Sequence, residues 1–232
     1  MIIMPNRRRA GYSGNDGYTK LLLHFDGANE ATSTFDSARS KNVMSMNGGI
    51  ISTTQSVFGG SSLYLSDSAS QSVSTPYSAG FNLGTGNFTI DYRVRPASVS
   101  GTARNIFMVR SDPTNNIIHQ LGTDGKLIFA AYLGNVAKAN YSGASGFSVD
   151  TWYHVAVVRN GTSLKIYVDG TAISLTETTA IGTNDIGQAS GTAYVGVYSG
   201  AYSAYGWIDE FRLSKGIARW TANFTPPTVP YR

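Results

Sequence analysis

Two acidic residues stand next to each other near the end of the chain. Asp209 and Glu210 lie in an alternating segment that also contains Trp207, Phe211 and Leu213. Neighbouring side chains of a strand point to opposite faces, so these two acids cannot face one another across a sugar, as catalytic carboxylates of glycoside hydrolases do. We therefore expect no catalytic role for this pair.

Asp209 is notable for a second reason, because its expected companions on the strand face are the three apolar residues just named. A buried carboxylate must be hydrogen-bonded, paired with a cation or bound to a metal. Loop amides, a guanidinium such as that of Arg212 or Arg219, and a metal ion are the three alternatives that the sequence leaves open.

Aromatic side chains gather just before these acids. Tyr194 and Trp207 flank residues 198–206, which we interpret as a loop tip. The tyrosines of this loop are Tyr198, Tyr202 and Tyr205. Exposed Tyr and Trp are rigid anchors that suit contact with a glycan or a partner protein. In the alternative interpretation, Tyr194 and Trp207 belong to the core and the loop tyrosines cover the edge of the sheet.

Other reactive groups are sparse. His24, His119 and His154 are far apart in sequence and lack the spacing of metal ligands. The chain has no cysteine, no Gly-x-Ser-x-Gly elbow and no phosphate-loop or dinucleotide fingerprint. We predict histidines with hydrogen-bond partners inside strands, no catalytic residue and no enzyme activity.

The formal net charge of +4 is spread along the chain, apart from Arg7, Arg8 and Arg9. Nucleic-acid binding needs basic residues clustered on one face, so we expect none. The arginine triplet could dock on an acidic capsid or on a neighbouring subunit through charge-assisted bonds; the alternative is a soluble tail. No apolar run approaches the roughly 20 residues that cross a bilayer, so we expect no membrane insertion.

These residues need strands to position them, and strict alternation predicts strands. Phe88, Ile90, Tyr92 and Val94 alternate with Thr89, Asp91, Arg93 and Arg95. A period of two sends the first set to a core and the second set to solvent. Residues 152–158 are apolar on both faces, which favours a central strand that is covered on both sides.

Three dipeptides predict tight antiparallel hairpins, because Gly and a preceding Asn or Asp accept positive φ angles. They are Asp124-Gly125, Asn160-Gly161 and Asp169-Gly170. Further strands are expected at residues 21–25, 62–65, 106–110, 193–198 and 207–213. About a dozen short strands predict an all-β, two-sheet antiparallel β-sandwich.

The ends of the chain differ from its middle. Residues 1–17 have little apolar periodicity and are expected to form an extended arm. Residues 18–214 are expected to form the sandwich. Pro226, Pro227 and Pro230 exclude residues 215–232 from a central strand, so we expect an extended tail that packs on the sandwich.

Six short segments carry a family resemblance. They are LLLHFDG (21–27), FGGSSLYL (58–65), NFTI (87–90), WYHVAV (152–157), KIYVDG (165–170) and GWIDEFR (206–212). Together they resemble the laminin G-like, concanavalin A-like lectin/glucanase jelly roll, from about Tyr18 to Leu213. The closing stretch LSKGIARWTANFTPP (213–227) is similar to the ends of such domains in structural proteins of tailed phages.

The resemblance implies a virion structural protein without enzyme activity, one that decorates a capsid or belongs to a tail or fibre and binds a surface or a carbohydrate. Its partners would be other virion proteins or host-surface glycans, and it would assemble in the host cytoplasm, with a homo-oligomer as one arrangement. The alternatives are a host-glycan-binding adhesin and a divergent glycoside hydrolase. The Glu-x-Asp-x-x-Glu hydrolase motif is absent.

The same family implies a structural calcium, held by an acid near the first strand and one near the last. Asp26 and Asp209 are the matching residues. Since Ca²⁺ takes about six to eight oxygen ligands, backbone carbonyls would have to supply most of them.

Overall fold

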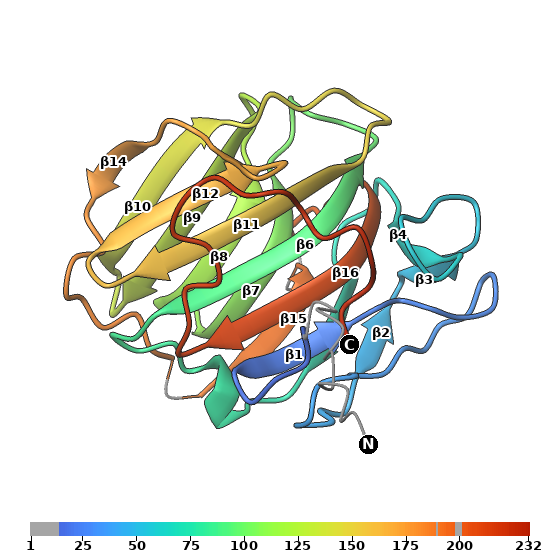
Figure 1. Cartoon of the computed structure of the whole chain (residues 1–232), viewed down its shortest axis with the longest axis horizontal. Coiled ribbons are helices and arrows are strands. Elements are labelled where there is room, and N and C mark those ends of the chain that lie inside the picture. The colour runs from blue at the N-terminus through green and yellow to red at the C-terminus, as the bar shows by residue number, and fades with distance from the viewer. Residues whose placement is uncertain (1–13, 189, 198–200) are drawn as a thin grey trace, which may run out of the picture.

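The computed structural model describes residues 14–188, 190–197 and 201–232, and its regular secondary structure is almost entirely strands, arranged in two antiparallel sheets (Figure 1). Sheet A has the order β13-β12-β11-β6-β16-β4-β3, and β1 pairs with β16 beside β4. The strands of sheet A are β1 (Thr19–Leu23), β3 (Ile50–Ser52), β4 (Ser62–Leu65), β6 (Phe88–Pro96), β11 (Tyr153–Asn160), β12 (Ser163–Val168), β13 (Thr171–Ala172) and β16 (Gly206–Lys215).

Sheet B has the order β14-β10-β9-β8-β7-β15-β5-β2. Its strands are β2 (Ser45–Asn47), β5 (Ser72–Thr75), β7 (Arg104–Asp112), β8 (Asn115–Leu121), β9 (Lys126–Leu133), β10 (Val136–Ala144), β14 (Thr176–Thr179) and β15 (Thr192–Gly196). One 3₁₀ turn, η1 (Ala79–Phe81), precedes β6. No helix in the described part of the chain is long and apolar enough to cross a bilayer.

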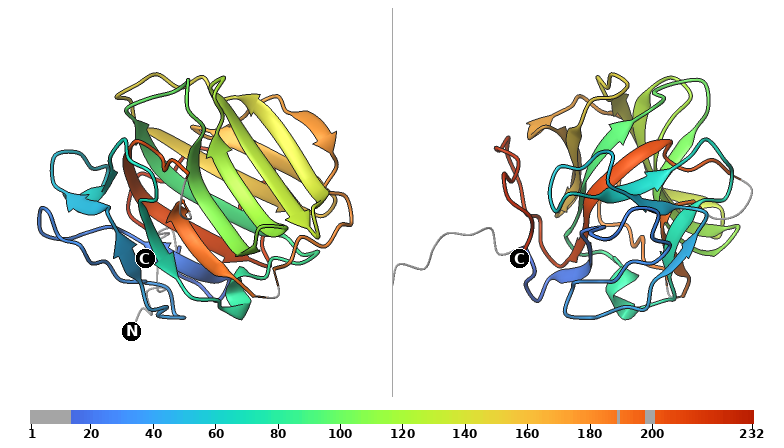
Figure 2. Two further views of the ribbon diagram at one scale, coloured as in Figure 1. Left: turned by 180° about the vertical axis from the view of Figure 1, so that it is seen from behind. Right: turned by 90° about the vertical axis from the view of Figure 1, so that its right-hand side faces the viewer.

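One hydrophobic core fills the space between the sheets (Figure 2). The inward residues of β6 are all in it: Phe88, Ile90, Tyr92 and Val94. Burying a large apolar side chain contributes about 1.5–3 kcal/mol, so the alternating pattern decides which face of β6 points inward. The predicted two-sheet sandwich is confirmed.

The outward residues of β6 contradict the expectation of solvent exposure. Thr89 and Asp91 are fully buried, and Arg93 and Arg95 are half-buried. The cause is a third layer: residues 216–232, here called the C-terminal strap, cross the outer face of sheet A (Figure 2, right). The strap also covers the second apolar face of β11, where Ala156 and Val158 pack with Trp220.

Backbone hydrogen bonds fix the path of the strap. Phe224 N donates to Gly170 O at 2.9 Å, so the strap passes over the predicted Asp169-Gly170 turn. It then runs back across the sheet, where Arg93 Nη2 donates to Pro227 O at 2.5 Å. Near its end, Asn15 N donates to Arg232 O at 2.9 Å, which brings the two ends of the described chain together.

The other two predicted hairpins are also present. Asp124-Gly125 joins β8 to β9, and Asn160-Gly161 joins β11 to β12. Gly125, Gly161 and Gly170 all have positive φ angles, of 76°, 59° and 77°. Glycine adopts this conformation without the steric penalty that other residues meet.

A β-bulge interrupts β16. Asp209 pairs with Arg93 and Arg212 pairs with Asp91, so one strand has an extra residue between these pairs. Glu210 occupies the bulge with a φ of 50°. Because the bulge shifts the alternation, Ile208 and Phe211 both point into the core.

Candidate functional site

A cluster of aromatic and arginine side chains lies where β16 begins and β6 ends; within it Tyr202 is exposed and Arg104 is buried. We call it the aromatic rim, and its members are Tyr64, Arg95, Arg104, Tyr202, Tyr205 and Trp207. Trp207 pairs in register with Tyr64 on β4 and with Arg95 on β6, which places all three on the outer face of sheet A. Arg104 starts β7 of sheet B, so the rim bridges the two sheets at one end of the sandwich.

Each rim arginine lies against aromatic rings. The Arg95 guanidinium carbon is 5.0 Å from the centre of the Trp207 ring, and the Trp207 and Tyr64 rings are 4.9 Å apart. The Arg104 guanidinium carbon is 5.3 Å from the Tyr202 ring and 5.6 Å from the Tyr205 ring. Cation–π contacts of this kind contribute about 0.5–1 kcal/mol at exposed sites, and they fix the orientation of the rings.

Two carboxylates hold the arginines in place. Asp150 binds Arg95 at 2.6 Å, and Asp67 binds Arg104 at 2.5 Å. Burial, together with the nearby Tyr205 and Asp67, raises the pKa of Tyr64, so its hydroxyl stays protonated near neutral pH.

Backbone hydrogen bonds anchor the described part of the loop that carries Tyr202 and Tyr205. Tyr202 O accepts a hydrogen bond from Asn105 N at 2.9 Å, Ala204 N donates to Asn105 O at 2.7 Å, and Ala97 N donates to Tyr205 O at 2.8 Å. A contact surface that is already ordered loses less entropy on binding. The rim is therefore pre-organised.

Three polar atoms at or beside the rim have no hydrogen-bond partner within the described chain: Trp207 Nε1, Arg104 Nε and Asn105 Oδ1. Most buried polar groups in folded proteins are hydrogen-bonded, so orphaned groups call for an explanation. All three atoms are buried, so a ligand on the surface of the rim does not reach them unless side chains move.

A groove of about 340 Å³ lies beside the rim, and Phe147 links the two. Its lining residues are Val99, Ser100, Asp124, Gly125, Lys126, Ala144, Ser145, Gly146 and Phe147. Ligand pockets typically measure about 300–1,000 Å³. The Phe147 ring stacks on Tyr153 at 4.5 Å, so this end of the sandwich offers further aromatic surface.

The structure brings together part of the predicted tyrosine set. Tyr202 is 43% exposed and Tyr205 is half-buried, whereas Tyr198 falls outside the described residues. Tyr194 and Trp207 are half-buried and do not belong to the core between the sheets. The sequence analysis missed the two arginines and Tyr64, because the register between distant strands brings them to the loop.

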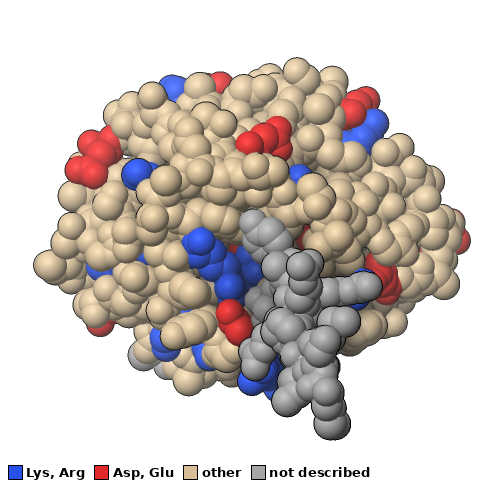
Figure 3. Space-filling view, viewed as in Figure 1, with Lys and Arg blue, Asp and Glu red and all other residues tan. Residues whose placement is uncertain are grey.

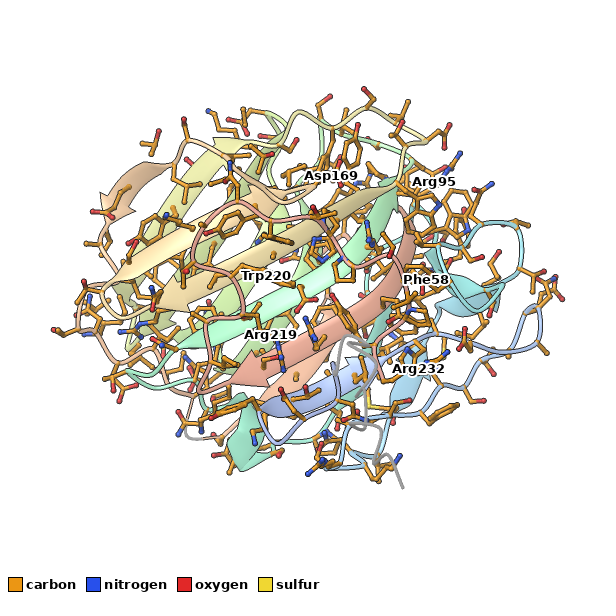
Figure 4. All side chains as sticks on the ribbon, in the orientation of Figure 1. Phe58, Arg95, Asp169, Arg219, Trp220 and Arg232 are labelled. Atoms are coloured by element: carbon orange, nitrogen blue, oxygen red, sulfur yellow. The ribbon has the colours of Figure 1, made fainter. Side chains whose placement is uncertain are left out.

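Asp209 lies in a different environment from the one predicted. Its strand neighbours Phe211 and Leu213 point into the core, but the bulge leaves Asp209 on the outer side with Arg93. Its Oδ2 accepts hydrogen bonds from Val57 N at 2.8 Å and Phe58 N at 3.1 Å. The loop-amide alternative is therefore correct, and Figure 4 shows Phe58 over this part of the sheet.

Glu210 also lies on the outer side, so the expectation that the two acids point to opposite faces is wrong. Glu210 Oε2 accepts from Tyr231 N of the strap at 3.0 Å, and Oε1 bonds to His24 Nδ1 at 2.7 Å. Both acids are buried beneath the segments that bond them. They are not open to a sugar.

The donor set around Asp209 does not fit calcium. Oδ1 accepts from Glu210 N at 2.8 Å, so both Asp209 oxygens already bind backbone amides. The Asp26 carboxylate lies against Gly59, where an added Cβ would sit 1.5 Å from Oδ1. Within the described ranges, no group of three or more His, Asp or Glu side chains is arranged to hold a metal ion.

A buried ionic network lies under the strap. Arg212 binds Asp91 through two bonds of 3.0 and 3.1 Å, and the Tyr231 hydroxyl donates to Asp91 Oδ2. The Arg212 guanidinium carbon is 3.6 Å from the centre of the Tyr231 ring. Trp220 and Phe224 stack at 4.1 Å and approach His154 edge-on, and Trp220 marks this region in Figure 4. The strap thus hydrogen-bonds and covers charges that sheet A alone would leave at its surface.

The remaining predicted residues have no place in the rim. Arg7, Arg8 and Arg9 fall outside the described residues. His119 bonds to the Tyr92 hydroxyl at 2.7 Å and to Ile128 O at 2.9 Å, and burial lowers its pKa to about 4. His119 therefore has the strand environment that was expected.

This architecture, a two-sheet jelly roll with its exposed aromatic cluster at a loop end, defines a lectin-like domain. The chain belongs to the concanavalin A-like lectin/glucanases superfamily, whose laminin G-type profile matches residues 67–219, more than half of the chain. A search of curated proteins gave no match.

Solved structures share the fold at low sequence identity. Domain 4 of AbnA, an extracellular arabinanase from Geobacillus stearothermophilus solved with arabinotriose, is 16% identical with a TM-score of 0.62, covering 86% of this chain and 93% of that one. The binding domain of Paraclostridial Mosquitocidal Protein 1 is 14% identical with a TM-score of 0.62, covering 86% of this chain and 49% of that one.

The binding domain of botulinum neurotoxin serotype G is 14% identical with a TM-score of 0.63, covering 85% of this chain and 48% of that one. The chain thus spans about half the length of these two toxin domains. At identities this low, the comparison shows only that the fold is shared. A ligand has to be inferred from the residues of the site itself.

Proposed function

We propose that this chain is a non-enzymatic binding module that contacts a glycan through the aromatic rim. The observation that carries the proposal is the ordered, partly exposed set of Tyr202, Tyr205 and Trp207, held by two arginines and bordered by orphaned polar atoms. Aromatic faces accept the C–H faces of sugar rings, and the half-buried Arg95 can donate to the hydroxyl groups of a sugar.

The setting that we propose is a virion, with the module on a capsid, tail or fibre. The support is the similarity of residues 213–227 to the ends of phage structural domains. In this setting, other virion proteins are its partners, and the rim points toward the host surface. A receptor-binding adhesin would contact the host surface in the same way but would be present in few copies per particle.

A glycan array with single-alanine variants tests the binding site. We expect Tyr202→Ala and Tyr205→Ala each to weaken the array signal about five- to ten-fold, because each removes a contact worth roughly 1–1.4 kcal/mol. Tyr77 is a matched control: it is 41% exposed, close to the 43% of Tyr202, and it lies between β5 and η1, away from the rim.

Tyr77→Ala should keep the full signal. An array in which the rim variants and the Tyr77 variant bind equally well would show that the rim is not the glycan site. Thermal unfolding of each variant identifies any loss of signal that comes from unfolding.

A further inference from the structure

A second surface feature lies at the other end of β16. It is a groove of about 510 Å³, lined by Gly17, Tyr18, Lys20, Ser78, Ala79, Gly80, Lys215 and Gly216. We call it the lysine groove. Strands rise about 3.3 Å per residue, so the ten-residue β16 separates the lysine groove from the aromatic rim by roughly 30 Å. The lining residues of the lysine groove come partly from the start of β1 and the end of β16, which lie side by side in Figure 1.

Two ammonium groups of this groove are held by backbone carbonyls. Lys20 Nζ donates to Gly17 O at 2.6 Å, and Lys215 Nζ donates to Ala79 O at 2.9 Å. An ammonium group has three donors, so each lysine keeps donors for a ligand. The carbonyls reduce the freedom of the long side chains, which lowers the entropy cost of binding.

The lining residues include no acid. Asp16, which precedes the lining residue Gly17, is engaged by Arg219 at 2.9 and 3.2 Å, so this pair is neutral overall. The positive charges of Lys20 and Lys215 therefore remain uncompensated. Figure 3 shows that charged side chains are sparse on this face of the molecule.

Tyr18 supplies a flat wall. It is 48% exposed, and its backbone is fixed to β16 because Lys215 N donates to Tyr18 O at 2.9 Å. Its ring packs over Gly216, where an added Cβ would lie 3.3 Å from Cδ1. Gly80 allows the Lys20 stem to approach in the same way, since an added Cβ would lie 2.9 Å from Lys20 Cβ.

We propose that the lysine groove binds an acidic saccharide. The carboxylate or sulfate group of the sugar lies between Lys20 and Lys215, and the sugar ring lies against Tyr18. The aromatic wall favours a sugar over a bare phosphate polymer, whose binding depends on a longer run of cations than two lysines provide. The proposal concerns a separate site and stands whether or not the rim binds a glycan.

Isothermal titration calorimetry on the full chain tests it with three probes of equal length: an oligogalacturonate, a heparin-derived oligosaccharide and a neutral galacto-oligosaccharide. Lys20→Gln combined with Lys215→Gln should weaken at least one acidic probe about ten-fold or more, because two charge-assisted contacts are lost. Tyr18→Ala should weaken the same probe, and the affinity should fall as salt rises. Lys165→Gln, an exposed lysine on β12, should change it less than two-fold.

The preferred acidic probe identifies the group as carboxylate or sulfate. The proposal is wrong if the native chain binds neither acidic probe, or if the double lysine variant binds as the native chain does while its unfolding midpoint is unchanged. Lysine-dependent binding of anionic vesicles or DNA without binding of acidic saccharides would also overturn it. Tyr202→Ala and Tyr205→Ala should leave this binding intact, which separates failure here from failure at the rim.

Discussion

At the scale of single residues, the outer face of sheet A contains a fully buried ion pair, Asp91 with Arg212. Burial alone would raise the pKa of Asp91, but Arg212 and His154 outweigh it and lower the pKa to about 2. A buried ion pair is weak evidence for stability by itself. Removing only one of the two charged groups nevertheless destabilises the fold, because the other charge stays buried without a partner.

Asp91→Asn should therefore destabilise the protein by about 3–5 kcal/mol. The double variant with Arg212→Met should cost less than the sum of the two single changes, because no unpaired charge is then left. Urea unfolding of the three variants measures this. Strictly additive effects would mean that Asp91 and Arg212 do not act as a pair.

His24 gives a prediction about pH. Burial opposes the charge of its imidazole, but the hydrogen bond and charge of Glu210, with help from Asp26 and Asp209, outweigh burial and raise its pKa above 6.5. The protonated His24 therefore stabilises the fold fully when the pH is below its pKa in the unfolded chain. This stabilisation is lost as the pH rises through its pKa in the folded chain. As the pH rises above about 6.5, the native chain should lose stability more steeply than His24→Gln.

Burial raises the pKa of Asp209 to about 7, against the opposing effect of its amide bonds. The contribution of Asp209 to the free energy of unfolding therefore falls as pH rises from about 4 to 7. This range lies mostly below the pH at which His24 loses its proton. Unfolding free energies at a series of pH values separate the two groups. Identical slopes for the native chain and His24→Gln above pH 6.5 would contradict the assignment.

At the scale of elements, the alternating pattern of β6 and the three glycine turns were enough to predict the hairpins, the sandwich and most of the longer strands, whereas β2, β3, β5, β10 and β14 were not predicted. The bulge at Glu210 was not predictable, because a positive φ at a glutamate leaves no local signal. Tertiary contacts hold it, through His24 on one side and Tyr231 on the other. The outward side chains of β6 were misjudged for a related reason, since only the path of the strap decides that they are covered.

Gly170 and Gly161 form a matched pair that tests the strap. Both have positive φ, but a Cβ at Gly170 would lie 1.8 Å from Phe224 O, whereas nothing lies within 4 Å of one at Gly161. Gly161→Ala should cost only the backbone strain of roughly 1–2 kcal/mol. Gly170→Ala should cost clearly more, because it also displaces the strap from Ala156, Val158 and Tyr167.

Thermal unfolding and limited proteolysis near residue 224 compare these two variants. We expect faster cleavage of the strap only in Gly170→Ala. Equal midpoints and equal cleavage would mean that the close passage of Phe224 over the turn does not stabilise the fold.

At the scale of the whole molecule, stability comes from one core between two sheets and from the strap outside them. In the last strand, backbone amides bond Asp209, and His24 and the Tyr231 amide bond Glu210. We expect that a chelator leaves the midpoint of thermal unfolding unchanged. A drop of several degrees with EDTA, restored by added Ca²⁺, would show that calcium stabilises the fold after all.

The closure of the two sheets explains which residues of the aromatic rim could be predicted from the sequence. The loop tyrosines were visible in the sequence as a dense aromatic segment. Their arginine partners were not, because Arg95 and Arg104 come from strands of different sheets that meet only when the sandwich closes. The rim is thus a product of the fold, with Tyr202 as its most exposed aromatic residue.

The central claim is that this rim contacts a sugar. The most direct measurement is a crystal structure of the chain with the glycan that ranks highest on the array. We predict a sugar ring against Tyr202, Tyr205 or Trp207, with its hydroxyl groups within hydrogen-bond distance of Arg95 or Arg104. Density for the sugar at a different surface, with the rim empty, would contradict the account.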